Sequence, residues 1–95
     1  MKNKEGSKIS LYKLKREMNA EKPTIWIGKE GVAPGIVEEI SRQLENKEVV
    51  KVKILKSAIK REEVKKIGLK IAQKTESGLI DVRGHMLLLY KPKNR

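Results

Sequence analysis

The segment from Thr24 to Gly31 most restricts the possible folds, because a strand-like pattern changes there into a helical one. Its first four residues, TIWI, are β-branched or aromatic and favour a strand. Gly28-Lys29-Glu30-Gly31 follows, and an amphipathic helical pattern begins near Pro34. Glycines have no Cβ, so they allow a sharp turn with accessible backbone. The segment therefore predicts a strand, a glycine turn and a helix in direct succession.

The same glycine turn is a candidate phosphate-binding site. The first N–H groups of a helix have no partner within the helix and can bind an anion. KH domains use a Gly-x-x-Gly loop in this way to hold the backbone of single-stranded nucleic acid. Lys29 would attract a phosphate, although Glu30 beside it partly cancels the charge. Many strand–helix turns contain two glycines for geometric reasons only, so a purely structural turn remains an alternative.

Hydrophobic periodicity along the chain predicts three helices and four strands in the order α-β-α-β-α-β-β. We expect helices at about 7–19, 34–46 and 60–75, and strands at 24–27, 48–56, 79–83 and 86–91. Ser7 or Ser10 can cap the first helix, and Asn46 can end the second. Parallel strand–helix–strand units and a final antiparallel hairpin give an α/β fold, a small single-domain α-β sandwich with a four-stranded mixed sheet. Residues 1–95 form one domain, with 1–6 and 93–95 flexible.

Within the second strand, strict alternation separates apolar from basic side chains. Val50, Val52 and Ile54 should face the core, whereas Lys51 and Lys53 should lie on the wetter face. The last strand contains Leu87-Leu88-Leu89, which predicts that both of its faces are covered.

Two features stand out in the third predicted helix. Gly68 is unfavourable in a helix, so we expect it to permit close packing. Lys66, Lys70 and Lys74 recur at i+4 spacing and repel one another. This stripe either faces an anion or is simply a solvated charged face. Between the last two strands, Gly84-His85 suits a two-residue turn with glycine first.

The chain is strongly basic, with 23 Lys and Arg against 12 Asp and Glu and a net charge of +11. The excess lies outside residues 24–46, toward both ends of the sequence. Such a surface attracts polyanions and favours nucleic acid as the partner, although solubility alone is the simpler explanation. The abundance of Lys and Glu also resembles the composition of hyperthermophile proteins.

Other residue counts restrict the chemistry. The chain has no Cys and one His, which argues against disulfides and zinc sites. No apolar run has the length of a membrane span or a signal peptide, so we expect a soluble cytoplasmic protein. With neither paired carboxylates nor a Walker-type loop, we expect no catalytic residue, no metal and no cofactor. A small phosphoryl-transfer enzyme and a DNA-binding protein are the less favoured alternatives.

Three separated blocks resemble one known family. They are Ile25 to Val32, then Val50-Lys51-Val52-Lys53, and finally Val82-Arg83-Gly84-His85 leading into Leu87 to Pro92. In this order they resemble the CRM domain family (chloroplast RNA splicing and ribosome maturation), whose single-domain bacterial members are YhbY-like. Members of the family often carry Ser or Thr at the position of Ala33, so a side-chain cap on the second helix is in doubt.

The resemblance implies a non-catalytic RNA-binding protein with a fold like the C-terminal domain of translation initiation factor three. It implies ribosomal RNA or large-subunit precursors as the partner, with intron splicing or general RNA chaperoning as alternatives. We expect a monomer that binds no membrane. Trp26 is interpreted as a packing residue rather than a platform for base stacking. The expected RNA-binding residues are the loop and exposed basic side chains: Gly28, Lys29, Glu30, Gly31, Lys51, Lys53, Lys66, Lys70 and Arg83.

Overall fold

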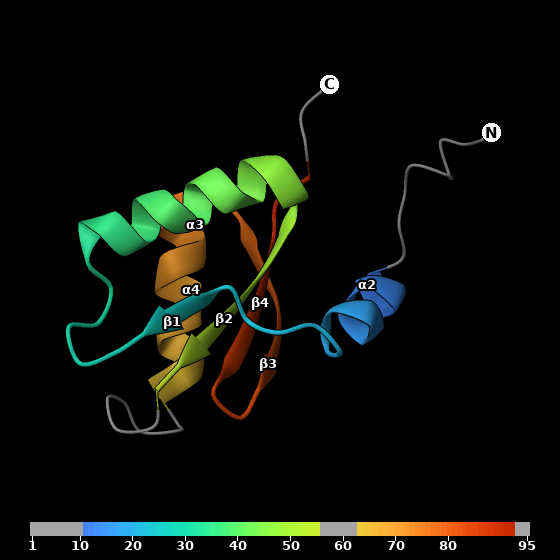
Figure 1. Cartoon of the computed structure of the whole chain (residues 1–95), viewed down its shortest axis with the longest axis horizontal. Helices are drawn as coiled ribbons and strands as arrows, with labels where there is room; N and C mark the ends of the chain where they lie inside the picture. The colour runs from blue at the N-terminus through green and yellow to red at the C-terminus, as the bar shows by residue number, and fades with distance from the viewer. Residues whose placement is uncertain (1–10, 56–62, 93–95) are drawn as a thin grey trace.

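The computed structural model describes residues 11–55 and 63–92, which form three helices and one four-stranded sheet (Figure 1). The predicted order of elements is confirmed. Four predictions fall outside the described residues: the caps Ser7 and Ser10, the flexibility of each end of the chain, and the start of the third helix near residue 60. The helices are α2 (Leu11–Met18), α3 (Pro34–Lys47) and α4 (Val64–Thr75), and the strands are β1 (Ile25–Ile27), β2 (Val49–Ile54), β3 (Gly78–Arg83) and β4 (Met86–Tyr90).

The sheet has the strand order β1-β2-β4-β3. β1 pairs with β2 in parallel, and β4 pairs with both β2 and β3 in antiparallel fashion. Because β4 lies between β2 and β3, these two strands run in the same direction without pairing. β1 and β3 are the edges of the sheet. β1 is only three residues long, and β3 has an irregularity in its pairing between Leu79 and Asp81.

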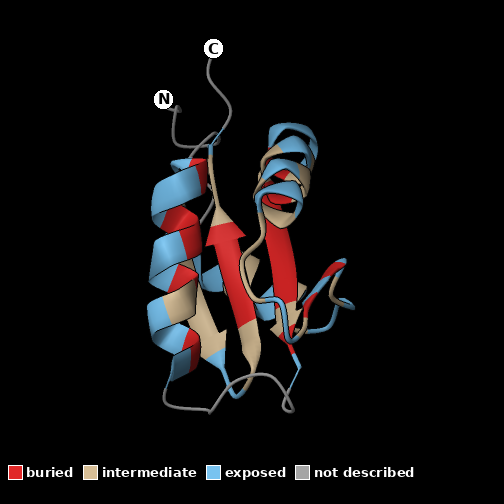
Figure 2. Cartoon of the chain, turned by 90° about the vertical axis from the view of Figure 1, so that its left-hand side faces the viewer, coloured by how far each residue is buried: buried red, intermediate tan, exposed pale blue. Residues whose placement is uncertain are grey.

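One face of the sheet, the helix face, packs against α3 and α4 and forms the core. Every second residue of β1, β2 and β4 points into it, which confirms the predicted alternation of β2. Figure 2 shows the burial that results, with the strands buried beside the two helices. The fully buried side chains of this core include Ile27, Val52, Ile54, Leu87 and Leu89 from the sheet and Ile40, Leu44, Val64 and Ile71 from the helices.

Gly68 lies where α4 crosses the sheet, and it is buried. A Cβ atom at this position would lie 2.9 Å from Leu87 Cδ2 and 3.0 Å from Leu79 Cδ2, closer than side chains normally approach. The close packing expected from the sequence is therefore confirmed. Glycine here brings α4 nearer to the sheet than any larger residue would allow.

The helix ends differ from the sequence-based expectation at one point. α3 does not stop at Asn46 but continues to Lys47, and Glu48 follows in a left-handed conformation with φ 70°. α4 ends in the same way at Glu76, with φ 56°. Glycine is the usual residue at such positions, because other L-residues are strained there. Two glutamates therefore take a role for which their side chains give no signal in the sequence.

Candidate nucleic-acid interface

The loop after β1 is a tight turn closed by its own backbone. Gly31 N–H donates to the Gly28 carbonyl oxygen at 2.9 Å, and Lys29 and Glu30 at the centre of the turn are both exposed. Gly31 has φ +71°, a left-handed conformation that favours glycine. At Gly28 a Cβ would lie 3.6 Å from Leu55 Cδ1, an ordinary contact. The second glycine is thus required by conformation, whereas the first is not.

The turn leads directly into the N-terminus of α3. Ala33 is extended, with φ −82° and ψ 158°, and its side chain makes no capping hydrogen bond, as expected for alanine. Its carbonyl oxygen accepts the N–H groups of Ile36 and Val37 at 3.0 and 3.2 Å. The first turn of α3 contains no acidic residue, so no carboxylate from that turn neutralises the positive end of the helix dipole. This end of α3 is therefore suited to an anion.

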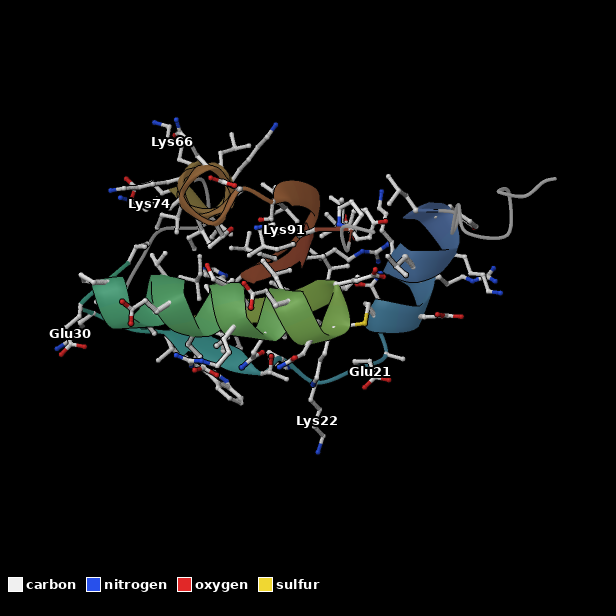
Figure 3. The ribbon with its side chains drawn as sticks, turned by 90° about the horizontal axis from the view of Figure 1, so that it is seen from above. Glu21, Lys22, Glu30, Lys66, Lys74 and Lys91 are labelled. Carbon is white, nitrogen blue, oxygen red and sulfur yellow. The ribbon has the colours of Figure 1, made fainter. Side chains whose placement is uncertain are left out.

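Two lysines lie close to this junction. Lys29 is on the loop itself, and Lys74 of α4 lines a shallow depression together with Val32, Pro34, Val37 and Glu38. Figure 3 shows Glu30 at the outer end of the loop and Lys66 and Lys74 on α4, pointing in different directions. The predicted site omits Lys74, although its spacing from Lys70 already placed it on the basic stripe. Lys66 and Lys70 are exposed, as expected.

The prediction that Lys51 is exposed is wrong. Its side chain is buried, with 5% relative exposure. Its ammonium group donates to the backbone carbonyl oxygens of Met18, Asn19 and Glu21 at 3.1, 3.2 and 2.9 Å. An ammonium has three N–H donors, and these bonds use all of them. Lys51 does point away from the core, but the C-terminal end of α2 covers it, so its role is structural.

Trp26 is less completely packed than its interpretation as a packing residue implies, because 53% of its surface is exposed. Trp26 lies on the outer face of the sheet, which we define as the face opposite α3 and α4. Lys53 is half-buried and Arg83 is exposed on the same face. Arg83 Nε is 3.2 Å from Asp81 Oδ2. The predicted residues therefore fall into two places, with Lys53 and Arg83 on the outer face and the others, apart from Lys51, at the loop and on α4.

The turn between β3 and β4 has the predicted form. Gly84 has φ 58°, and the His85 carbonyl oxygen accepts the N–H of Ile54 at 2.8 Å. Over residues 11–55 and 63–92, no three His, Cys, Asp or Glu side chains gather into a possible metal site. Nor does any helix in these ranges have the length and apolar character needed to cross a membrane.

Sequence comparison relates the chain to known proteins. The model of the CRS1 / YhbY (CRM) domain matches residues 7–91. A probable RNA-binding protein of Methanocaldococcus jannaschii is 33% identical over 85 aligned positions, and the match covers 85% of this chain and 63% of the relative. The chain thus spans less than two thirds of that protein. An RNA-binding protein of Haemophilus influenzae is 31% identical over 70 residues, covering 74% of this chain and 69% of the relative.

Structural comparison gives a similar picture. The solution structure of a Staphylococcus aureus protein, for which RNA binding is proposed, matches with a TM-score of 0.75 and 26% sequence identity. The match covers 90% of this chain and 86% of the other. The similarity therefore extends over nearly the whole fold.

Proposed function

The chain belongs to the CRS1 / YhbY (CRM) domain family, and from this membership we propose that it is a non-catalytic RNA-binding protein. The names of its relatives as RNA-binding proteins support the proposal. We further propose ribosomal RNA or a precursor of the large subunit as the target, with the protein acting as a cytoplasmic monomer. The target follows from the resemblance to single-domain, YhbY-like family members.

One observation carries the proposal, namely the junction between β1 and α3. Three features follow one another there within ten residues. They are an exposed lysine, a turn closed by Gly31, and a helix N-terminus without a carboxylate in its first turn. Each of these features favours a phosphate, and together they suit a nucleic-acid backbone. The net charge of +11 supplies a long-range attraction that brings the polyanion to the loop.

Charge reversal at Lys29 tests the loop. We expect Lys29→Glu to weaken RNA binding by about tenfold, near 1.4 kcal/mol. Its side chain is exposed, so thermal melting should hardly change. Lys22→Glu is the matched control, because it changes the net charge by the same amount. Lys22 is also exposed, but it lies before β1, whereas Lys29 follows that strand. Affinity for a ribosomal RNA fragment and melting temperature should be measured on the same samples.

The comparison of the two variants separates a local contact from a general loss of charge. If Lys29→Glu weakens binding much more than Lys22→Glu, the loop contacts RNA. Equal losses would mean that only the overall charge matters, and the loop would then be a structural turn. If the unaltered protein binds no RNA at moderate salt, the proposed function itself is wrong.

A further inference from the structure

The outer face of the sheet carries one row of side chains that crosses all four strands. The pairing register places Trp26 of β1 opposite Lys53 of β2, Lys53 opposite Met86 of β4, and Met86 opposite Arg83 of β3. Adjacent strands of a sheet lie about 4.7–4.9 Å apart. The four residues are therefore neighbours on one surface, which we call the Trp26 row.

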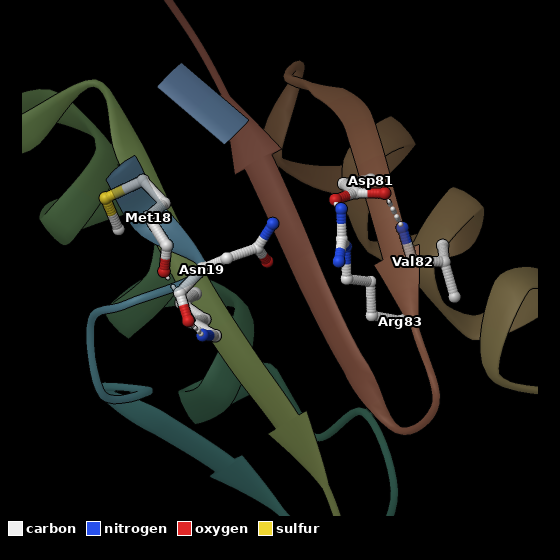
Figure 4. A network of polar contacts seen from close by, with 6 residues as sticks. Met18, Asn19, Asp81, Val82 and Arg83 are labelled. Carbon is white, nitrogen blue, oxygen red and sulfur yellow. Dashed lines mark hydrogen bonds and ion pairs between the residues drawn. The ribbon is translucent and has the colours of Figure 1, made fainter. Parts of the chain in front are cut away.

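The Trp26 row is open, although the row beside it is covered. In the neighbouring row, Lys51 and Leu88 are paired and are only 5% and 1% exposed. α2 accounts for the cover of Lys51, because the Lys51 ammonium donates to carbonyl oxygens at the C-terminal end of α2, and Leu14 and Met18 line a hollow with Val49 and Lys51. Figure 4 shows the end of α2 over β2, with Arg83 further along the sheet on β3.

An exposed tryptophan in a strand needs a reason. Its neighbours Ile25 and Ile27 point into the core and are 5% and 0% exposed, whereas Trp26 keeps 53% of its surface in contact with water. Burying this indole on the helix face would require a shift in register by one residue, which would expose both isoleucines. The strand thus presents a large aromatic ring on the outer face without loss to the core.

The chemistry of the row fits unpaired nucleotides. An indole offers a flat surface on which any base can stack, and such stacking is tolerant of sequence. Lys53 and Arg83 are cations on either side of Met86, and 66% of the Arg83 side chain remains exposed despite its contact with Asp81. Met86 adds a soft apolar surface between them. A second copy of this chain fits less well, since its two cations would meet the same two cations.

We propose that the Trp26 row binds a single-stranded segment of RNA, with one base stacked on Trp26 and nearby phosphates at Lys53 and Arg83. This inference rests on the proposed RNA-binding function. Trp26 precedes Gly28 by two residues, about 7 Å along an extended strand. One RNA strand can therefore contact the glycine loop with its backbone and the outer face with a base.

The single tryptophan of the chain makes the test direct, because its fluorescence reports on Trp26 alone. Three probes of about 12 nucleotides are needed, within the range of single-strand site sizes: an unpaired RNA, the same backbone without bases, and a duplex. We expect the unpaired RNA to quench the fluorescence strongly. The abasic strand should bind more weakly and quench little, and the duplex should not give the same quenching.

Substitution provides the second arm of the test. We expect Trp26→Leu to weaken binding of the unpaired RNA by about tenfold, while Trp26→Phe keeps most of the affinity. Leu69→Ala is the control, since Leu69 is 52% exposed but lies on α4, which packs on the helix face. Its affinity should match that of the unaltered protein, and all three variants should melt alike because the altered side chains are largely exposed.

The outcomes distinguish this inference from the proposed function. If Lys29→Glu weakens RNA binding but Trp26→Leu does not, and the abasic strand binds as well as RNA, the protein binds RNA without the Trp26 row. If Trp26→Leu instead changes the sedimentation of the protein alone, the ring is a contact between copies. Either result overturns the inference. Absence of any RNA binding would overturn both it and the proposed function.

Discussion

At the scale of single residues, Lys51 and Lys53 show what alternation in a strand can and cannot predict. Both lie on the outer face, as the period of two requires, and both face away from Val50, Val52 and Ile54. Yet Lys51 is buried under α2 and Lys53 is not. The pattern within a strand gives the direction of each side chain. It does not show which side chains another segment covers, and the segment that covers Lys51 lies about thirty residues away in the sequence.

Replacing Lys51 should therefore affect stability rather than RNA contact. Lys51→Met leaves three carbonyl oxygens at the end of α2 without their charged donor, which should cost about 1–3 kcal/mol. In a domain of this size that corresponds to a fall in melting temperature of at least several degrees, at roughly 4–8 °C per kcal/mol. Lys53→Met removes the same charge from the same face and should change stability by less than about 0.5 kcal/mol. Equal melting of the two variants would show that the contacts with α2 contribute nothing.

At the scale of elements, the sequence predicted the positions of the strands and helices. It predicted the close packing at Gly68 but not the conformation of the helix ends. Helical periodicity located α3 and α4, and Gly68 signalled close packing because glycine is a poor helix former. The left-handed ends at Glu48 and Glu76 gave no such signal. Local propensity favours glycine or asparagine there, and the path of the chain into the next strand overrides that preference.

Gly68→Ala tests the packing of α4 against the sheet. Alanine raises helix propensity by about 1 kcal/mol, but overpacking a core costs about 1–3 kcal/mol. We expect a net destabilisation on the order of 1 kcal/mol, because the methyl group would press on buried Leu87 and on Leu79. Gly35→Ala in α3 is the control, as nothing lies within 4 Å of its Cβ position. Denaturant unfolding should show Gly35→Ala as neutral or stabilising; a stabilised Gly68→Ala would mean that the leucines move aside freely.

The end of α4 allows a gain in stability. Glu76 is exposed and has φ 56°, so Glu76→Gly should relieve strain and stabilise the domain by up to about 1 kcal/mol. Gln73→Gly places glycine within the same helix and should instead destabilise by about 1 kcal/mol. The two variants should move the unfolding midpoint in opposite directions. A shift in the same direction would argue that the conformation at Glu76 carries little strain.

At the scale of the whole molecule, the sequence predicted the order of the elements, the mixed sheet and the parallel pairing of β1 with β2. The resemblance identified the family, because three blocks in one order are more specific than the glycine motif. The arrangement of the outer face could not be predicted in this way. It depends on where α2 ends, because the C-terminal end of α2 covers Lys51 while Trp26 stays exposed.

Binding of RNA by the whole molecule should depend strongly on salt. The basic residues exposed near the loop, along α4 and on the outer face could neutralise about four to six phosphates, which predicts a slope of log affinity against log salt of roughly −3 to −5. Stacking on Trp26 does not release counterions, so Trp26→Leu should lower the affinity without changing the slope. Lys29→Glu removes a phosphate contact and should make the slope less steep. A titration series at several potassium concentrations measures both. Tight binding with a flat response to salt would contradict an electrostatic interface.

The edges of the sheet bear on how readily a chain with so many apolar strand residues could aggregate. Exposed strand edges invite other chains to pair with them, and long, regular edges are the most prone to aggregate. Here one edge, β1, has three residues, and the other, β3, is interrupted between Leu79 and Asp81. Neither offers the long run of free backbone groups that a growing fibril would need as a template. The geometry of the two outermost strands therefore disfavours pairing from edge to edge between copies of the chain.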